Sequence, residues 1–374
     1  MKKGIKLLYK KLVSYFFFLI YSRPTLDLNF QDKKNYVEKI FSYKKEKYNV
    51  FKIINGRLYN ATNNVAYLSK NFLLKSLSFQ YKNSKNSNIK KNITLVIGTP
   101  SFLKKIKGRV FSLLSGGGAK SNYGHWLFDV LPRIYLLNKF FSIKKIDKFL
   151  VPSIKYDYQL KTLNILGIKK KKLIESNNFR HLQACELYAT SHPNHHNFGN
   201  ISGWSVKFLR ENFLKKKNNK KIYNFEKVYL DRGEFCLYEN SNNISKFKDH
   251  RIIINEKEIK SFLITKGFKI LKPYEFSFLD QVNIFSRLKF IISLFGAGLT
   301  NICFCKKRTK VIEIKTIKAG NEWLNLSKLV GLDHYQIPLK PIIKSGIPQN
   351  GLLFCNLSKI KKAINVLENK EVDL

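Results

Sequence analysis

The sequence predicts an α/β protein of more than one domain, with parallel sheets covered by helices. Apolar runs of strand length alternate with helical segments between residues 149 and 314, a pattern typical of βαβ units. The length of 374 residues corresponds to two or three domains at roughly 150 residues each. A hydrophobic share of 44% is enough for a large buried core.

The net charge bears on which molecules the chain can bind. The chain carries 69 Lys+Arg against 25 Asp+Glu, a formal net charge of +44, which favours anionic partners. Many lysines can equally reflect A/T-rich codons and lie on solvated faces. We find no helix-turn-helix, zinc-finger or RRM signature, so we expect no specific nucleic-acid partner. An anionic membrane surface and a polyanionic substrate remain open. The 5 cysteines form no C-x-x-C pair and fit a reducing compartment.

Residues 1–24 form a basic and apolar segment. Five lysines precede or interleave with the apolar residues 12–21, a stretch too short to span a bilayer. It can pack on the protein's own core, or lie in a membrane interface with its lysines at the headgroups. It is also similar to the apolar core of a signal peptide, but no A-x-A cleavage site follows. We therefore expect a cytoplasmic protein, either free or peripheral on the inner membrane.

Residues 25–95 have the pattern of a β-rich extension. Residues 50–54 and 57–60 flank Asn55-Gly56, a dipeptide that favours a type I′ hairpin turn. The polar residues 82–92 are expected to form a loop. Strands are expected at residues 94–97 and 110–114.

Two domains, residues 96–221 and 222–374, are expected to follow. The first should contain strands at 149–152 and 182–190 and helices at 158–166 and 202–213, with the charged stretch 215–221 as the boundary. The second should contain strands at 227–230, 268–271, 290–294 and 310–314 and helices starting after Asn255 and Ser277.

The first candidate site follows three consecutive glycines, 116–118. His125, Asp129 and Arg133 recur every four residues, which on a helix places them on one polar face. Pro132 implies that this helix is kinked or starts late. A histidine beside a carboxylate suits a general base. The alternative is a core histidine next to an Asp129–Arg133 ion pair.

The second candidate site is the turn Gly296-Ala297-Gly298 between a strand and a short helix. Free N–H groups at such a helix start bind anions, although a plain strand-to-helix turn is the alternative. Neither the dinucleotide G-x-G-x-x-G nor the P-loop lysine pattern is present. Arg232, after one strand, and Arg251, before the helix at Asn255, suit a diphosphate because guanidinium binds oxygens bidentately.

The remaining sequence patterns do not predict a metal site. His192, His195 and His196 suggest a metal site or an exposed, substrate-facing loop, and we expect the loop because no Cys or acid lies at ligand spacing within it. Cys303 and Cys305 face apart on a predicted helix and are expected in the core. The sequence lacks Asp-x-Asp, Gly-x-Ser-x-Gly and His-Glu-x-x-His motifs.

Taken in order, these motifs resemble those of glycosyltransferase family 61, which includes bacterial capsular-polysaccharide transferases. The matching stretches are 122–133, Arg251 with Asn255-Glu256, 296–301 and 311–314, within roughly residues 50–340. The resemblance implies a GT-B-like fold, in which two Rossmann-like domains face a cleft. It also implies an inverting transferase that needs no metal or other cofactor.

The resemblance further implies substrates and roles. A hexosyl or pentosyl group would pass from a nucleotide-sugar donor to a glycan or lipid-linked acceptor in the synthesis of capsular polysaccharide, lipopolysaccharide or another surface glycan. His125 would be the base and Asp129 would orient it, although their order is open. Asn122, Trp126 and Arg133 would lie on the acceptor side. The donor would be bound by Arg232, Arg251, Gly296, Gly298, Thr300, Asn301 and Glu313.

Two positions depart from the family's pattern. Family members often have histidine where this chain has Phe295, and serine where it has Asp231. Phenylalanine cannot donate to phosphate, and a carboxylate repels a diphosphate unless it is turned away. The alternative function is therefore a catalytically degenerate basic protein that binds polyanionic glycan or nucleic acid. A third alternative is a membrane-surface assembly factor anchored by residues 1–24.

Overall fold

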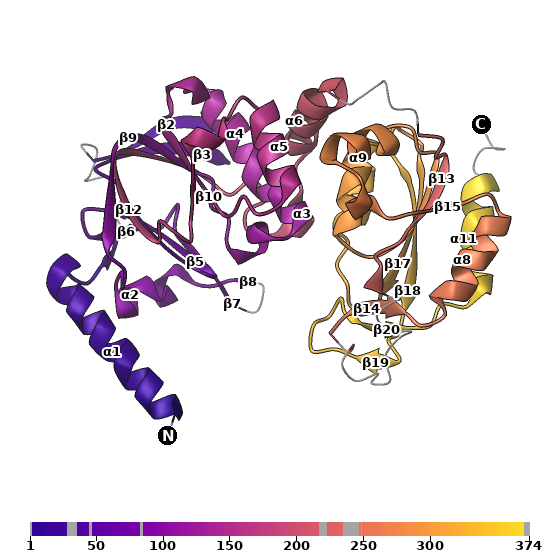
Figure 1. Cartoon of the computed structure of the whole chain (residues 1–374), viewed down its shortest axis with the longest axis horizontal. Helices are drawn as coiled ribbons and strands as arrows, with labels where there is room; N and C mark the ends of the chain where they lie inside the picture. The colour runs from indigo at the N-terminus through magenta and orange to yellow at the C-terminus, as the bar shows by residue number, and fades with distance from the viewer. Residues whose placement is uncertain are drawn as a thin grey trace. The chain divides into compact units, whose positions relative to one another are not determined.

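The computed structural model describes residues 2–27, 36–44, 47–82, 85–216, 223–234, 247 and 249–369. The chain divides into two compact units, Met1–Phe198 and Gly199–Leu374, which are described separately (Figure 1). Residues 215–221, the expected domain boundary, follow helix α6 (Gly203–Phe213) in the second unit. Of these, residues 217–221 lie outside the described part of the chain.

The first unit consists of a mixed sheet with helices packed around it. Its strands are β1 (Thr25–Asp27), β2 (Val37–Tyr43), β3 (Tyr48–Ile54), β4 (Arg57–Ala61), β5 (Asn64–Ser69), β6 (Phe72–Leu74), β7 (Phe79–Lys82), β8 (Lys85–Asn86), β9 (Leu103–Ser112), β10 (Lys148–Val151), β11 (Leu173–Glu175) and β12 (His181–Thr190). Its α-helices are α1 (Lys2–Tyr21), α2 (Thr94–Ile97), α3 (Tyr123–His125), α4 (Leu131–Asn138) and α5 (Asp157–Ile165).

Strand β12 joins the two halves of this sheet. The main strand order is β1-β6-β5-β4-β12-β9-β10-β11. β12 runs parallel to β9, which is parallel to β10, whereas β3 and β4 pair antiparallel with β12. Residues 25–95, expected as an extension, therefore contribute strands to the same sheet as the parallel strands. One core cluster includes Phe51 and Ile53 of β3 together with Val110 of β9 and Leu187 of β12.

The hairpin expected at Asn55-Gly56 is wrong, because β3 and β4 pair with β12 rather than with each other in the described sheet. Asn55 adopts φ 49°, a left-handed conformation that asparagine tolerates, and its N–H donates to the carbonyl of Cys185 at 2.8 Å. A Cβ on Gly56 would lie 2.7 Å from Cβ of Leu187, so glycine is needed at this close approach. The dipeptide joins two strands that pair with β12 in one continuous register, since Ile54 pairs with Glu186 and Arg57 with Gln183.

Two further expectations for the first unit are wrong. Residues 94–97, expected as a strand, form the short helix α2. The side chain of Asn92 accepts the N–H of Thr94 at 3.0 Å and starts this turn, which ends at Gly98 with φ 69°. The polar residues 82–92, expected as a loop, include β8 and a 3₁₀ turn, Ile89–Lys91. The expected elements at 110–114, 149–152, 158–166 and 182–190 are confirmed as β9, β10, α5 and β12.

The second unit is built on a five-stranded parallel sheet of order β15-β13-β16-β17-β18. Its strands are β13 (Lys227–Leu230), β14 (Arg251–Ile253), β15 (Lys269–Leu271), β16 (Phe290–Leu294), β17 (Lys310–Thr316), β18 (Asp333–Leu339), β19 (Ile343–Lys344) and β20 (Gly351–Leu353). Besides α6, its α-helices are α8 (Glu256–Thr265), α9 (Phe278–Phe285), α10 (Glu322–Val330) and α11 (Leu357–Asn369). A small sheet, β14-β20-β19, completes it.

Helices cover both faces of this parallel sheet, with α8 and α11 on one face and α9 on the other (Figure 1). Ile259 and Leu263 of α8 and Ile360 of α11 share a buried cluster with Ile292 of β16 and Ile312 of β17. Strands buried on both faces have nearly continuous apolar sequences, and the strands expected in this unit are confirmed. The predicted α/β class is confirmed as well. No described helix combines the length and apolar content needed to cross a bilayer.

Candidate active site

The candidate site of the first unit lies on a helix that changes pitch. α3 leads into a π-helical turn, Trp126–Val130, and then into α4. Pro132 has no N–H to offer the carbonyl of Phe128, and the side chain of Asn194 replaces it, with Nδ2 3.3 Å from that oxygen. The kink expected at Pro132 is thus a π turn, a feature frequent at functional sites.

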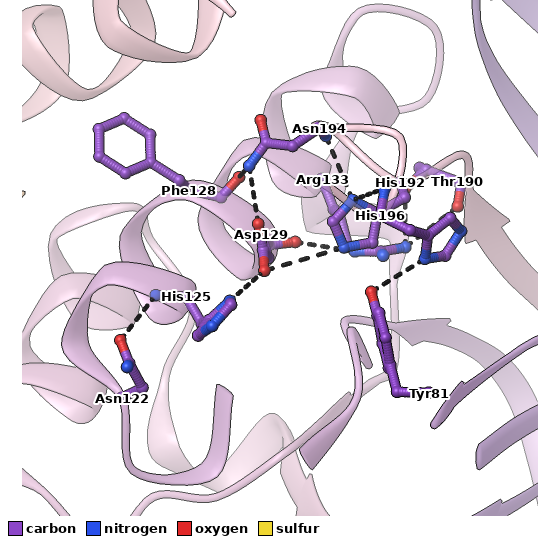
Figure 2. A network of polar contacts seen from close by, with 10 residues as sticks. All are labelled: Tyr81, Asn122, His125, Phe128, Asp129, Arg133, Thr190, His192, Asn194 and His196. Atoms are coloured by element: carbon purple, nitrogen blue, oxygen red, sulfur yellow. Dashed lines mark hydrogen bonds and ion pairs between the residues drawn. The ribbon is translucent and has the colours of Figure 1, made fainter. Parts of the chain in front are cut away.

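Asp129 is the centre of a buried polar network (Figure 2). Its side chain is 5% exposed, and Oδ2 lies 2.6 Å from Nδ1 of His125 and 3.8 Å from Nε2 of His192. The other oxygen, Oδ1, accepts from Nδ2 of Asn194 at 2.7 Å. Polar contacts on both oxygens offset the cost of burying a carboxylate. We call the group around it the Asp129 network: Tyr81, His125, Asp129, Arg133, His192, Asn194 and His196.

His125 is the accessible member of this network. Asn122 caps α3, accepting the N–H groups of Gly124 and His125 at 2.9 and 3.2 Å. The imidazole packs on the ring of Phe198, with 4.8 Å between centroids, and a Cβ at Gly118 would lie 2.9 Å from it. The side chain is 36% exposed, so the alternative of a core histidine is wrong.

The contact with Asp129 decides the chemistry of His125. A carboxylate only accepts hydrogen bonds, so Nδ1 of the neutral imidazole carries the proton and Nε2 carries the lone pair. The lone pair is what a general base needs, and the carboxylate stabilises the imidazolium that forms after proton uptake.

Arg133 binds backbone carbonyl groups of the site and makes no ion pair with the Asp129 carboxylate at hydrogen-bond distance. It is 1% exposed; Nε donates to the backbone carbonyl of Asp129 at 2.9 Å and Nη1 to that of Thr190 at 3.1 Å. Burial lowers its pKa. Trp126 is also fully buried, and its Nε1 donates to Oγ1 of Thr162 at 2.9 Å. Both side chains therefore hold the helix in place.

The histidine loop was expected to be exposed, and for His192 this is wrong. Its side chain is 2% exposed, and Nδ1 accepts the N–H groups of Asn194 and His196 at 3.2 Å each. The neutral ring therefore carries its proton on Nε2, toward Asp129. Burial, followed by the nearby Arg133, holds the pKa of His192 well below its usual value.

Sequence reasoning missed Asn194 and Tyr81, whose hydroxyl lies 3.0 Å from Nδ1 of His196, and it did not connect His192 with Asp129. The signal that could have found the loop is topological. β9 and β12 are parallel, so the segments that follow them leave the same edge of the sheet, where α/β proteins bind ligands. One segment leads to the glycines and His125, and the other contains His192 and Asn194.

The second unit has its own candidate site after β13 and β16. In chain order its sheet reads 2-1-3-4-5, so these two strands flank the switch point at which such sheets bind ligands. Arg232 follows β13, and the turn Phe295-Gly296 follows β16. Nη1 of Arg251 and Nη1 of Arg232 lie 3.0 and 3.5 Å from the carbonyl oxygen of Phe295. The sequence thus identified two arginines that the structure brings to one turn.

The Arg232 side chain fills the space beside Gly296 at this turn. A Cβ on Gly296 would lie 1.9 Å from Nη1 of Arg232. The guanidinium of Arg251 lies over the ring of Phe295, 5.4 Å from its centroid. Burial and the neighbouring Arg232 lower the pKa of Arg251 to about 10, so it remains charged at neutral pH.

Two carboxylates near the arginines, those of Asp231 and Glu234, each contact a positively charged side chain. Asp231 is turned away: Oδ2 lies 2.9 Å from Nζ of Lys260, and Oδ1 accepts the N–H of Gly233. Glu234 contacts Arg232, with 2.5 Å between Oε1 and Nη2. The repulsion expected from Asp231 is therefore offset by Lys260.

Other residues predicted to bind the donor lie in the interior of this unit. Thr300, Asn301 and Glu313 are fully buried. Nδ2 of Asn301 donates to Gln281 of α9 at 2.8 Å, and Oε2 of Glu313 lies 3.0 Å from Nε2 of His334. At Gly298 the nearest atom to an added Cβ is 4.0 Å away. Thr300, Asn301 and Glu313 are therefore inside the unit, whereas Gly298 is partly exposed.

Cys303 and Cys305 are fully buried, which confirms that they belong to the core. Within the described residues, no group of three or more His, Cys, Asp or Glu side chains is arranged to hold a metal ion.

Comparison with known protein families gives a match. The sequence model of the family described as Glycosyltransferase 61 matches residues 123–312. This stretch begins with α3 and ends within β17, so it contains both the His125–Asp129 pair and the Phe295-Gly296 turn. No curated protein matches the chain in a sequence search.

Proposed function

The chain belongs to glycosyltransferase family 61, and on that premise we propose that it is an inverting, metal-independent enzyme. It moves a hexosyl or pentosyl group from a nucleotide sugar to a hydroxyl of a glycan or lipid-linked acceptor in the synthesis of a surface polysaccharide. The observation that carries this proposal is the His125–Asp129 pair, in which an accessible imidazole is oriented by a buried carboxylate 2.6 Å away.

The reaction is a single displacement. The acceptor hydroxyl gives its proton to Nε2 of His125 while its oxygen bonds to the anomeric carbon of the donor. The bond from that carbon to the nucleotide diphosphate breaks, and the diphosphate leaves with the electron pair. Attack opposite the leaving group inverts the anomeric centre. Asp129 stabilises the imidazolium, and the charge of the departing diphosphate is met by Arg232 and Arg251.

Nucleotide binding provides the first test. Thermal unfolding is measured with UDP, GDP, CMP and ADP, each with and without EDTA, at high salt to suppress bulk charge binding. One nucleotide should stabilise the protein, by about 2.7 kcal/mol at a hundredfold excess over Kd, and EDTA should not change the shift. The donor class so identified is then used in a transfer assay.

A shift that disappears with EDTA would contradict metal independence. Absence of a shift with every nucleotide would favour the alternative, a catalytically degenerate basic binding protein for polyanionic glycan or nucleic acid. Phe295 motivates that alternative because its ring offers no donor and is only 7% exposed, packed 6.2 Å from Trp323. Such a protein should bind polyanions with a steep salt dependence and no base preference.

Gly296→Ala tests the donor site directly. The added Cβ displaces the Arg232 guanidinium, which is 1.9 Å from its position, so the nucleotide-induced shift should fall by about 1.5–3 kcal/mol, the net value of a hydrogen bond to a charged group. Unfolding of the free protein should change little because the end of a flexible side chain can move. Gly346→Ala is the matched control in the same unit, since nothing lies within 4 Å of an added Cβ there. Equal shifts in both variants would rule out Arg232 as a diphosphate ligand.

A further inference from the structure

Helix α1 has two different faces along its 20 residues. Ser14 and Phe17 are buried, and Tyr21 anchors the same side by accepting the N–H of Leu103 at 2.9 Å. The opposite side carries large apolar residues that are 46–71% exposed. They recur at helical spacing and are called here the N-terminal apolar face: Ile5, Leu8, Tyr9, Leu12, Tyr15, Phe16, Leu19 and Ile20.

This face is continuous and extends onto the sheet. Figure 1 shows α1 reaching away from the strands of the first unit, with only its last turns against them. Phe102, just before β9, is 68% exposed, and its ring lies 5.1 Å from that of Phe17 and 6.4 Å from that of Phe16. A run of exposed apolar side chains of this length marks an interaction surface.

The charged residues around the N-terminal apolar face indicate which kind of surface binds it. Residues 1–26 contain five lysines and Arg23, and the first acidic residue is Asp27. Lys10 and Lys11 of α1 are exposed, as is Lys105 three residues beyond Phe102. Tyrosine and phenylalanine beside lysines are typical of segments that lie at the level of lipid headgroups. Anionic lipid offers both an apolar layer and negative charge.

A second copy of this chain fits the same face less well. Parallel pairing of two such helices brings their lysines together with no acidic residue before Asp27 to offset them, and like charges across an interface oppose association. Antiparallel pairing sets the lysines of one helix against the uncharged residues 12–21 of the other, where they find no acidic partner. Nucleic acid would use the lysines but leave the apolar side chains in water.

We propose that α1 docks the protein on an anionic membrane surface, with the N-terminal apolar face immersed at the headgroup boundary and the helix parallel to the surface. This inference goes beyond the transferase activity and does not depend on it.

The test is sedimentation of the full-length protein with lipid vesicles. Leu8→Glu/Leu12→Glu is compared with Ile264→Glu/Ile342→Glu, which makes the same change in net charge at exposed apolar positions of the second unit, 58% and 59% exposed. Vesicles of phosphatidylcholine with phosphatidylglycerol are compared with phosphatidylcholine alone at about 0.15 M salt, where the Debye length is about 8 Å. Equal thermal unfolding of the two variants shows that both fold.

The wild type and the control variant should bind the anionic vesicles at least about tenfold more tightly than the neutral ones, and the α1 variant should lose at least about tenfold in affinity. Bound protein should be released by alkaline carbonate. Equal binding of the two variants would overturn the proposal in favour of nonspecific charge attraction. Resistance to carbonate would indicate insertion into the bilayer instead. If the protein binds no vesicles but forms dimers, and Leu8→Glu/Leu12→Glu dissociates them, the face serves self-association.

Discussion

Asp129→Asn is expected to lower the rate of sugar transfer by about 10²–10⁴-fold, the usual contribution of general acid–base catalysis. The amide keeps the shape of the carboxylate, and its oxygen can still accept from Asn194. Its NH2 group, however, would face Nδ1 of His125 and donate to it. The imidazole would then carry its proton on Nε2 and would have no lone pair for the acceptor hydroxyl.

The measurement is the transfer rate with the donor identified by nucleotide stabilisation. Nucleotide binding should be unchanged, because Arg232, Arg251 and the Phe295-Gly296 turn belong to the second unit. Asp157→Asn, an equal charge change at an exposed position of α5, is the control and should retain activity. If Asp129→Asn and His125→Ala both keep full activity, the catalytic assignment is wrong.

A double substitution shows whether the two residues act as a unit. His125→Ala alone should cost about as much as His125→Ala together with Asp129→Asn, because an orienting carboxylate has no effect once the base is gone. Additive losses would mean that Asp129 contributes independently of His125, and would leave open which of the two removes the proton.

Lowering the pH from about 7.5 to 5 is expected to reduce the free energy of unfolding of the first unit by about 4 kcal/mol. Burial lowers the pKa of His181 to about 4 and that of His196 to about 3. Nδ1 of His181 is held 2.9 Å from the carbonyl of Ser101. In the unfolded chain both residues regain a pKa near 6.5.

The sign follows from proton binding. Above pH 6.5 both histidines are neutral in the folded and in the unfolded chain, so the free energy of unfolding has its full value. Between pH 6.5 and the folded pKa values the unfolded chain binds more protons, so stability falls as the pH falls. At pH 5 each histidine contributes about 2 kcal/mol to the loss, and His192 acts in the same direction. A domain is usually stable by only about 5–15 kcal/mol, so mild acid should unfold this unit first.

Urea unfolding followed by pulsed hydrogen exchange of β12 peptides measures this loss at the two pH values. His196→Gln should remove about half of the pH dependence. His250→Gln, at a half-exposed side chain of the second unit, is the control and should leave the pH dependence of β12 unchanged. An unchanged pH dependence in His196→Gln would show that the buried ring is not responsible.

The sequence was informative where structure depends on neighbours along the chain. β16 and β17 were located because strands buried on both faces need nearly continuous apolar residues. The His125–Asp129 contact was found because residues four apart on a helix face each other. The family's motifs then separated these residues from other polar pairs in a very basic chain.

The sequence was less informative where residues in contact lie far apart along the chain. Asn55-Gly56 has the same letters in a hairpin turn and in a link between two strands, and the strands it links here both pair with β12. Asn194 enters the Asp129 network only because two parallel strands end at one edge of the sheet. For Glu313, the strand pattern could not distinguish a side chain that meets a ligand from one that pairs with His334 inside the unit.

The position of β12 in the sheet also has a consequence for synthesis on the ribosome. The side chain of Gln183 in β12 donates to the carbonyl of Asn55, 128 residues earlier in the chain. At about 5–20 residues per second, β3 and β4 wait on the order of ten seconds for this partner to emerge. During that interval their edges are open to pairing with other nascent chains. The high positive charge then has a use that no folded contact reveals, because it keeps such chains apart until the sheet can close.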